Sequence, residues 1–317
     1  MISFEQVYQT IHPQLLSLED LRKKQKSKKN IFLLTWLSSL ILAIFILAIS
    51  NEPTPGIVIL IISIVYLIVV IILIFSIVKK YKRMFKDAVI SPLIKAINPN
   101  LSYAKESCIS REKYMSSSIF LTHPDVYKGE DYVWGMVDKT MIEFSELHTQ
   151  YKTHDSKGRT QYHTIFKGLF MIADFNKDFK GRTVVMPDYG EKAFGFIAKF
   201  FQKMNLMRDQ LVYMEDPVFE KEFKVYSNDQ IEARYILSTD MLSRIVRLKQ
   251  RLGKKIHLSF VGSKICIAVS MTKDLFDPKM RQSVLDPNII KEFYIQIEGC
   301  IQIIDDMNLN TRIWSKQ

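Results

Sequence analysis

The chain has 317 residues, of which 48% are hydrophobic and 24% are charged, and its formal net charge is +11 at pH 7. This length allows one large or two ordinary domains. Its three cysteines show no C-x-x-C spacing, which is typical of free thiols in a reducing compartment. Residues 1–95 hold 12 Lys or Arg against 5 Asp or Glu, so most of the basic surplus lies near the N-terminus. That distribution argues against nucleic-acid binding.

Residues 1–30 are predicted to form an amphipathic N-terminal helix on the cytoplasmic side of a membrane. Apolar side chains recur there at steps of three and four residues: Phe4, Val7, Ile11, Leu15, Leu18 and Leu21. Pro13 is a position at which such a helix can bend. Two placements stay open, because the apolar stripe can pack on a cytoplasmic domain or lie on the bilayer.

Two uncharged apolar segments follow, Ile31 to Ile49 with 19 residues and Ile57 to Val78 with 22 residues. As helices they reach roughly 28 and 33 Å, which is enough to cross a hydrocarbon core of about 30 Å. A cleaved signal peptide does not fit the first segment, because its basic flank starts late and no small-residue cleavage site follows it. We therefore predict a transmembrane hairpin over residues 31–78, with spans at 31–49 and 57–78.

The basic residues next to the two spans predict the orientation of the hairpin. Six precede the first span and five follow the second: Arg22, Lys23, Lys24, Lys26, Lys28 and Lys29, then Lys79, Lys80, Lys82, Arg83 and Lys86. The connection "SNEPTPG" between the spans has no Lys or Arg. Cytoplasmic flanks carry the Lys and Arg excess, so both termini of this multi-pass membrane protein are expected in the cytoplasm.

Residues 79–130 are predicted to be a juxtamembrane stalk and linker, and residues 131–317 a cytoplasmic α+β domain of antiparallel sheet with packed helices. One hairpin is well specified, because Gly262 and Ser263 form a two-residue loop suited to a type II′ turn. The expected pairs are Phe260 with Ile265, Leu258 with Ile267 and Ile256 with Val269. These six share one face, and the other face carries His257, Ser259, Lys264 and Cys266.

Three segments carry a resemblance to a known family: "GEDYVWGMVDKTMIEFSEL", "FKGLFMIADFNKDFKGRTVVMPD" and "FKVYSNDQIEARYIL". They resemble the bacterial membrane-protein family catalogued as domain of unknown function 3137. The resemblance covers nearly the whole chain and implies the same order of parts: an N-terminal helix, two membrane spans and a cytoplasmic domain. It also implies a location in the inner membrane of a bacterium, and it implies no activity.

The sequence assigns no catalytic residue, no cofactor and no metal site, because it has no glycine-rich phosphate loop, H-E-x-x-H helix or G-x-S-x-G turn. His148, His154 and His163, with Asp155 nearby, are the best candidates for a metal site. Pairing Thr153 with Thr160 places His163 opposite Gln150 and makes His148 and His163 diagonal neighbours. The polar outer face of a strand explains these histidines equally well.

Arg244, Arg247 and Arg251 recur at three- and four-residue steps in "TDMLSRIVRLKQRLGKK", beside an apolar stripe that ends at Gly253. This arginine stripe is a candidate contact for anionic lipid headgroups or for an acidic protein partner. A solvated helix face is the alternative.

The sequence as a whole favours a membrane-anchored cytoplasmic binding or scaffolding module whose constant partner is the lipid bilayer. The alternative is a membrane-bound enzyme, for example a hydrolase, with its site in the sheet domain. The two are distinguished by what the purified protein carries with it, a protein partner or a small ligand.

Overall fold

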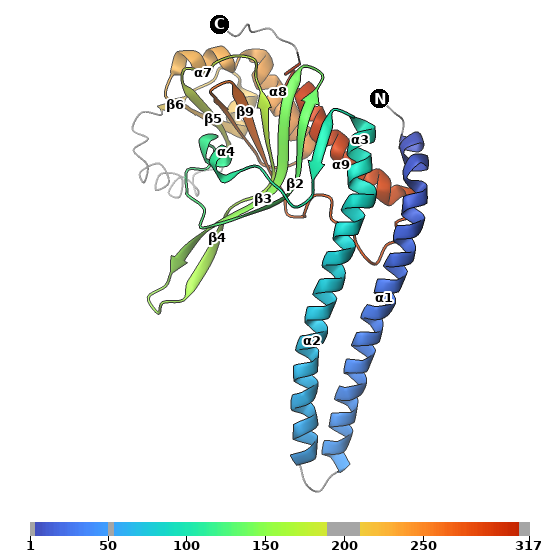
Figure 1. The fold of residues 1–317 in the computed structure, drawn as a ribbon. Helices are drawn as coiled ribbons and strands as arrows, with labels where there is room; N and C mark the ends of the chain where they lie inside the picture. The colour runs from blue at the N-terminus through green and yellow to red at the C-terminus, as the bar shows by residue number, and fades with distance from the viewer. Residues whose placement is uncertain (1–3, 50–53, 189–209, 311–317) are drawn as a thin grey trace. The chain divides into compact units, whose positions relative to one another are not determined.

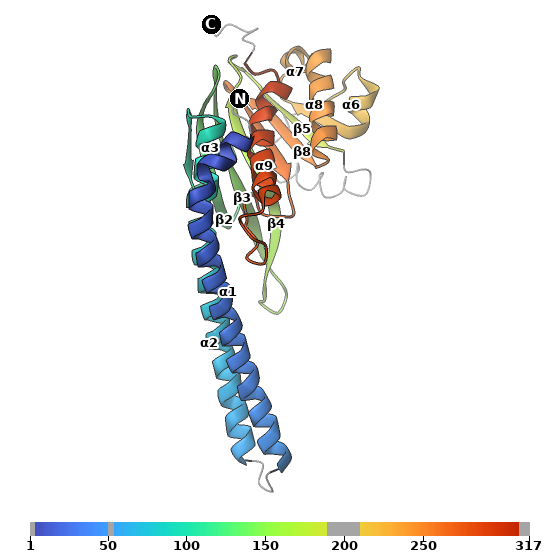
Figure 2. The same cartoon turned by 90° about the vertical axis from the view of Figure 1, so that its right-hand side faces the viewer.

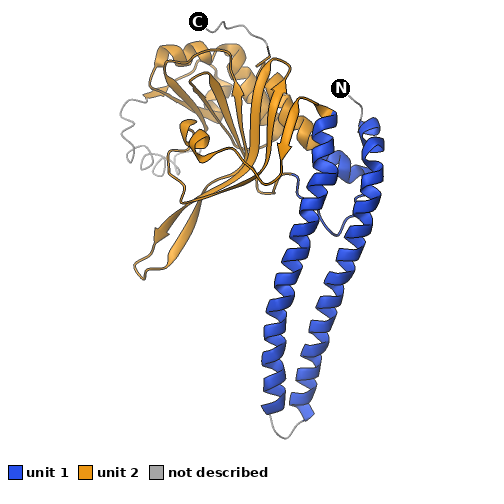
Figure 3. Cartoon of the chain, viewed as in Figure 1, with its two compact units in different colours: residues 1–96, 276–294 blue, residues 97–275, 295–317 orange. Residues whose placement is uncertain are grey.

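The computed structural model describes residues 4–49, 54–188 and 210–310. The chain divides into two compact units, shown in Figure 3. The first unit comprises residues 1–96 and 276–294, and the second comprises residues 97–275 and 295–317.

Two long helices make up most of the first unit: α1 (Phe4–Ile49) and α2 (Thr54–Phe85). Each contains a segment long and apolar enough to cross a membrane. Large apolar side chains point outward from these segments, and Leu34, Phe45 and Phe75 are 64%, 61% and 71% exposed. Two polar contacts join the helices inside the apolar segments, Thr35 Oγ1 to Tyr66 OH at 2.9 Å and Ser39 Oγ to Ser63 Oγ at 3.1 Å. Interhelical hydrogen bonds of this kind stabilise helix pairs in lipid.

Helix α1 is continuous through Pro13, where a bend was possible. Helix α2 passes into a π-helical turn, η1 (Lys86–Ile90), and then into α3 (Ser91–Ile97). Pro92 therefore lies inside one continuous helical stretch, directly after the π-helical turn, and a missing backbone hydrogen bond at a proline is a common cause of such an irregularity.

The apolar stripe of the N-terminal helix is buried within its own unit. Val7, Ile11 and Leu15 are at most 1% exposed. The segment 276–294 supplies part of the cover, since the Tyr8 hydroxyl donates to the Leu285 carbonyl at 2.9 Å and the rings of Phe4 and Tyr294 are 5.7 Å apart. Of the two placements that the sequence left open, the structure shows packing against protein.

A buried ion pair connects α1 to this segment. Arg22 donates through Nε and Nη2 to both carboxylate oxygens of Glu19, at 2.8 and 2.5 Å. Arg22 also donates to the Met280 carbonyl, and the Val284 amide donates to Glu19. Arg22 lowers the pKa of Glu19, against the effect of burial. Because both charges are hydrogen-bonded on several sides, their desolvation is compensated.

The second unit is built on one nine-stranded antiparallel sheet, with strand order β1-β2-β3-β4-β9-β8-β5-β7-β6 among the described residues. The strands are β1 (Leu101–Ala104), β2 (Val126–Val137), β3 (Thr140–His154), β4 (Thr160–Asp174), β5 (Arg182–Pro187), β6 (Gln210–Val212), β7 (Phe223–Ser227), β8 (Ile256–Val261) and β9 (Lys264–Ser270). The helices are α4 (Arg111–Ser116), α6 (Pro217–Glu222), α7 (Gln230–Ile236), α8 (Thr239–Leu252) and the later part of α9 (Pro287–Asp306). The chain is thus α+β, with two long apolar helices followed by an antiparallel sheet with helices, as the sequence predicted.

The hairpin of β8 and β9 has the predicted register: Phe260 pairs with Ile265, Leu258 with Ile267 and Ile256 with Val269. Gly262 has a φ of +59°, as the first central position of a type II′ turn requires. A two-residue loop leaves the strands little choice of pairing.

Both faces of this sheet are covered, so the face that carries His257, Ser259 and Cys266 is also buried. On that face, Tyr114 and Phe120 from the segment around α4 pack with Phe170 and Cys266. On the opposite face, Leu169 and Val269 line a groove together with Leu252 of α8 and Ile303 of α9, and Figure 2 shows both helices on that side of the sheet.

The two buried faces predict how substitutions affect stability. Leu258→Ala should lower the free energy of unfolding by roughly 2–5 kcal/mol, and Phe170→Ala, on the opposite face, by roughly 3–5 kcal/mol. Gln161→Ala, at an exposed position of β4, is the control and should cost under about 0.5 kcal/mol. Denaturant unfolding of the full-length protein in detergent, followed by near-ultraviolet circular dichroism, measures all three. If Phe170→Ala is as stable as Gln161→Ala, the burial of Phe170 under the residues around α4 is contradicted.

Candidate functional site

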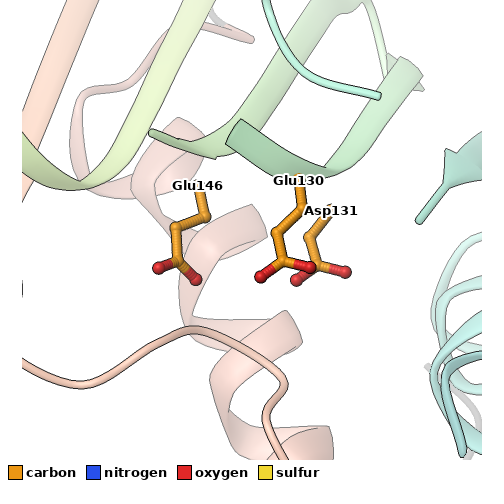
Figure 4. Close-up of side chains that lie close together, drawn as sticks. All are labelled: Glu130, Asp131 and Glu146. Atoms are coloured by element: carbon orange, nitrogen blue, oxygen red, sulfur yellow. The ribbon is translucent and has the colours of Figure 1, made fainter. Parts of the chain in front are cut away.

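Three carboxyl groups meet at a β-bulge on the second unit, and they form the acidic cluster in Figure 4. Glu130 of β2 lies directly opposite Glu146 of β3, and the register shifts immediately afterwards, between Glu130 and Val133. Asp131 is in the bulge, with a φ of +62°. One carboxylate oxygen from each residue lies within 4.8 Å of the other two.

The bulge explains how adjacent residues of one strand join the same cluster. In a regular strand successive side chains point to opposite faces, so Glu130 and Asp131 would diverge. The left-handed backbone at Asp131 changes that direction. Two hydrogen bonds fix this conformation of Asp131: its amide donates to the Lys105 carbonyl at 3.1 Å, and the Tyr103 hydroxyl donates to its carboxylate at 2.5 Å. Asp131 is only 1% exposed.

The carboxyl group of Glu146 has a strongly perturbed pKa. Burial, together with the nearby negative charges of Asp274, Glu130 and Asp131, raises the pKa of Glu146 to about 8. One contact lowers the pKa of Glu146 in part: the Leu275 amide donates to Glu146 Oε2 at 2.5 Å and stabilises the ionised form. Glu146 is therefore protonated over much of the physiological pH range.

Two kinds of chemistry fit this arrangement. Three carboxylates from two strands supply oxygen ligands of the sort that Ca²⁺ and Mg²⁺ prefer, and a cation would favour the ionised form of Glu146. A carboxyl group that titrates near neutral pH is also suited to general acid–base catalysis.

The structure places the arginine stripe on α8, and two of its three members have acidic partners in the second unit. Arg244 Nε donates to Asp240 at 2.7 Å, and Arg251 Nη2 lies 2.5 Å from Asp306 of α9. Arg247 is exposed. Ser238 caps the start of the helix, and Gly253 ends it in the left-handed conformation, as its position in the sequence suggested. Contact of the stripe with anionic lipid or an acidic partner stays a prediction.

The candidate metal-binding histidines are not brought together. The predicted register of β3 and β4 is wrong by one residue: Thr153 pairs with Gln161, and His163 pairs with Tyr151. His148 Nε2 lies 3.4 Å from Thr164 Oγ1, whereas His163 stacks on Tyr151 with ring centroids 4.9 Å apart. Thr164 and His163 are consecutive residues of one strand, so the two imidazoles lie on opposite faces.

The sequence did not reveal the acidic cluster. Glu130 and Glu146 are separated by 15 residues, and they become neighbours only through the pairing of β2 with β3. The local signal is the acidic pair Glu130–Asp131 inside a segment of strand-forming residues, where regular alternation would place the two carboxyl groups on opposite faces.

Comparisons with known proteins give a family and a distant structural likeness. The model of the family described as "Protein of unknown function (DUF3137)" matches residues 164–309, which contain the second and third segments of the resemblance seen in the sequence. That resemblance is thereby confirmed over this part of the chain. The comparison with curated proteins found no match.

A solved structure, the crystal structure of the mycobacterial trehalose monomycolate transport factor A, aligns with 71% of this chain and 95% of its own. The sequence identity is 9% and the TM-score is 0.36. A likeness at this TM-score supports no conclusion about function.

The raised pKa of Glu146 predicts a pH dependence of stability. The folded state holds this proton more tightly than the unfolded chain, whose carboxyl titrates near its ordinary pKa of 4.5. The tighter binding of this proton stabilises the folded state fully below pH 4.5, and the stabilisation is lost as the pH rises toward about 8. Each pKa unit corresponds to about 1.4 kcal/mol.

Glu146→Gln keeps the shape of the neutral carboxyl group and removes its titration. We expect the free energy of unfolding of the wild type to fall relative to this variant by at least about 1.4 kcal/mol between about pH 5 and pH 8. Thermal unfolding of the full-length protein in detergent across this range measures the difference. Glu112→Gln, at an exposed position of α4, is the control and should follow the wild type. If the stability of the wild type and of Glu146→Gln changes with pH in the same way, the raised pKa of Glu146 is contradicted.

Proposed function

We propose that this chain is an integral protein of a bacterial cell membrane, in which the hairpin of α1 and α2 anchors the second unit in the cytoplasm as a binding or scaffolding module. The observation that carries the proposal is the outward-facing apolar surface of the two helices. Side chains such as Leu34, Phe45 and Phe75 are more than half exposed over segments without a charge. A bilayer removes that surface from water.

The distribution of basic residues supports the cytoplasmic orientation. Lys and Arg flank both apolar segments on the sides away from their short connection, and the connection itself has none. This is the asymmetry that places flanks on the cytoplasmic side. Both ends of the hairpin, and with them the second unit, are then cytoplasmic.

A binding or scaffolding role on the cytoplasmic side fits the short connection between the two apolar segments. The connection between the apolar segments, residues 50–56, is too short to form a folded domain outside the cell. On the second unit, α7 exposes two large side chains on one face, Ile231 at 84% and Tyr235 at 52%. Neighbouring exposed apolar side chains are typical of surfaces that contact other proteins.

A second candidate is a membrane-bound enzyme, for example a hydrolase, and the acidic cluster favours it. Glu146 has the raised pKa that a general acid needs near neutral pH, and its carboxylate lies within 4.8 Å of those of Glu130 and Asp131, close enough for the three to share an ion. The two candidates differ in what accompanies the protein when it is purified.

The test is affinity purification of the full-length protein from detergent-solubilised membranes, with mass spectrometry of co-purifying proteins and analysis of bound metals and small molecules. We expect a protein partner at reproducible stoichiometry, retained equally by wild type and Glu146→Gln. A stoichiometric metal or nucleotide that disappears in Glu146→Gln, without a protein partner, contradicts the scaffold and favours the enzyme.

A further inference from the structure

Strands β3 and β4 continue beyond the sheet as a two-stranded arm, residues 151–165. The pairing of β2 with β3 reaches only Gln150, and the pairing of β9 with β4 begins at Gly168. Figure 1 shows the paired strands projecting past their neighbours in the second unit. A two-stranded hairpin by itself is marginally stable in water, so the contacts on its two faces decide whether it holds its shape.

One face of the arm is occupied by contacts among its own side chains. The rings of Tyr151 and His163 stack with centroids 4.9 Å apart, and His163 Nε2 lies 2.8 Å from Thr153 Oγ1. Tyr151, Thr153 and His163 are accordingly half-buried. This face stabilises the ribbon and leaves little surface for a partner.

The opposite face is exposed, basic and aromatic. Lys152 pairs across the strands with Tyr162, and its Nζ lies 5.6 Å from the centroid of that ring. Tyr162 is 55% exposed. The remaining positions of this face in the paired strands carry no carboxylate: His154, Thr160 and Thr164.

The turn at the end of the arm adds positive charge. Asp155 is its one carboxylate, and it accepts hydrogen bonds from the amides of Lys157 and Arg159, at 2.9 and 2.8 Å, and from Arg159 Nε at 2.8 Å. These bonds fix the turn, and Arg159 neutralises Asp155. In the described part of the chain, neither the Lys152 Nζ nor the Lys157 Nζ forms an ion pair, and the one carboxylate bonded to Lys152 is that of Asp125, which accepts from the Lys152 backbone amide at 2.6 Å.

We propose that the exposed face of the arm, through Lys152, Lys157 and Tyr162, binds the anionic phospholipid headgroups of the membrane that anchors the protein. This inference rests on the proposed membrane anchor, which keeps the arm tethered near a bilayer and so raises its effective concentration there. Lysine side chains are attracted to the negative cytoplasmic leaflet, and tyrosine is enriched at the headgroup level. Two lysines together favour the docked arm by roughly 30-fold, which is about 2 kcal/mol.

The experiment uses the full-length protein in lipid nanodiscs of two compositions, phosphatidylcholine alone and phosphatidylcholine with phosphatidylglycerol. An environment-sensitive fluorophore is attached at Ser156→Cys, in the exposed turn of the arm, with Cys108→Ser in the background. The other native thiols are buried, and burial raises the pKa of Cys266 and of Cys300 to about 12, so both react slowly. Nitroxide-labelled headgroups report contact with the membrane surface.

We expect a blue shift and nitroxide quenching in the discs that contain phosphatidylglycerol and neither in the neutral discs. Salt should reverse both, because the Debye length falls from about 10 Å at 0.1 M to about 3 Å at 1 M. Lys152→Glu combined with Lys157→Glu should shift the arm toward the free state by roughly 30-fold or more. Lys180→Glu combined with Lys221→Glu makes the same change in charge at exposed sites elsewhere on the second unit and should leave the signal intact.

Equal fluorescence spectra in the two kinds of disc overturn the proposal. Equal loss of the blue shift and of the quenching in the arm variant and in its charge-matched control also overturns it. A fluorophore that responds only when an acidic protein from the cell is added assigns the arm to a protein partner instead of lipid. If the protein fails to enter discs of either composition, the membrane anchor is contradicted as well. Incorporation without a response to phosphatidylglycerol contradicts the arm contact alone.

Discussion

Shielding of the apolar surfaces of α1 and α2 from water is the constraint on which the rest of the chain depends. In the segments 31–49 and 57–78 the two helices contact each other through a few polar side chains and buried apolar ones such as Ala43 and Val70, and most of their large apolar side chains point outward. Beyond these segments the character of unit one changes. The Glu19–Arg22 pair is fully buried and binds the backbone at Met280 and Val284. Unit one thus exposes apolar side chains along residues 31–49 and 57–78, whereas around Glu19 and Arg22 its helix is covered by other residues of the unit.

In the second unit, the part of the sheet around β4, β8 and β9 is covered on both faces. Phe170 lies among the aromatic residues around α4, and Leu169, next to it in β4, faces α8 and α9. Two irregular places of the sheet carry the candidate functions: the bulge at Asp131, where the acidic cluster forms, and the arm beyond Gln150, where the strands lose their neighbours.

Features set by local chemistry could be predicted from the sequence. Uncharged apolar segments defined the long helices, and the Gly262–Ser263 loop defined the register of β8 and β9. The register of β3 and β4 could not be predicted, because the longer loop "HDSKGR" permits more than one pairing and a bulge lies between Thr149 and Gln150. The acidic cluster depends on the pairing of Glu130 with Glu146 and on the left-handed backbone of Asp131. Neither follows from local sequence.

The accessibility of single cysteines in intact spheroplasts tests most directly whether the hairpin anchors the second unit in the cytoplasm. One cysteine replaces Thr54, at the start of α2, and another replaces Ser156, at the tip of the arm. A membrane-impermeant thiol reagent should label the first in intact spheroplasts and the second only after lysis. Labelling of position 156 in intact spheroplasts, with position 54 protected, would contradict the anchored cytoplasmic module.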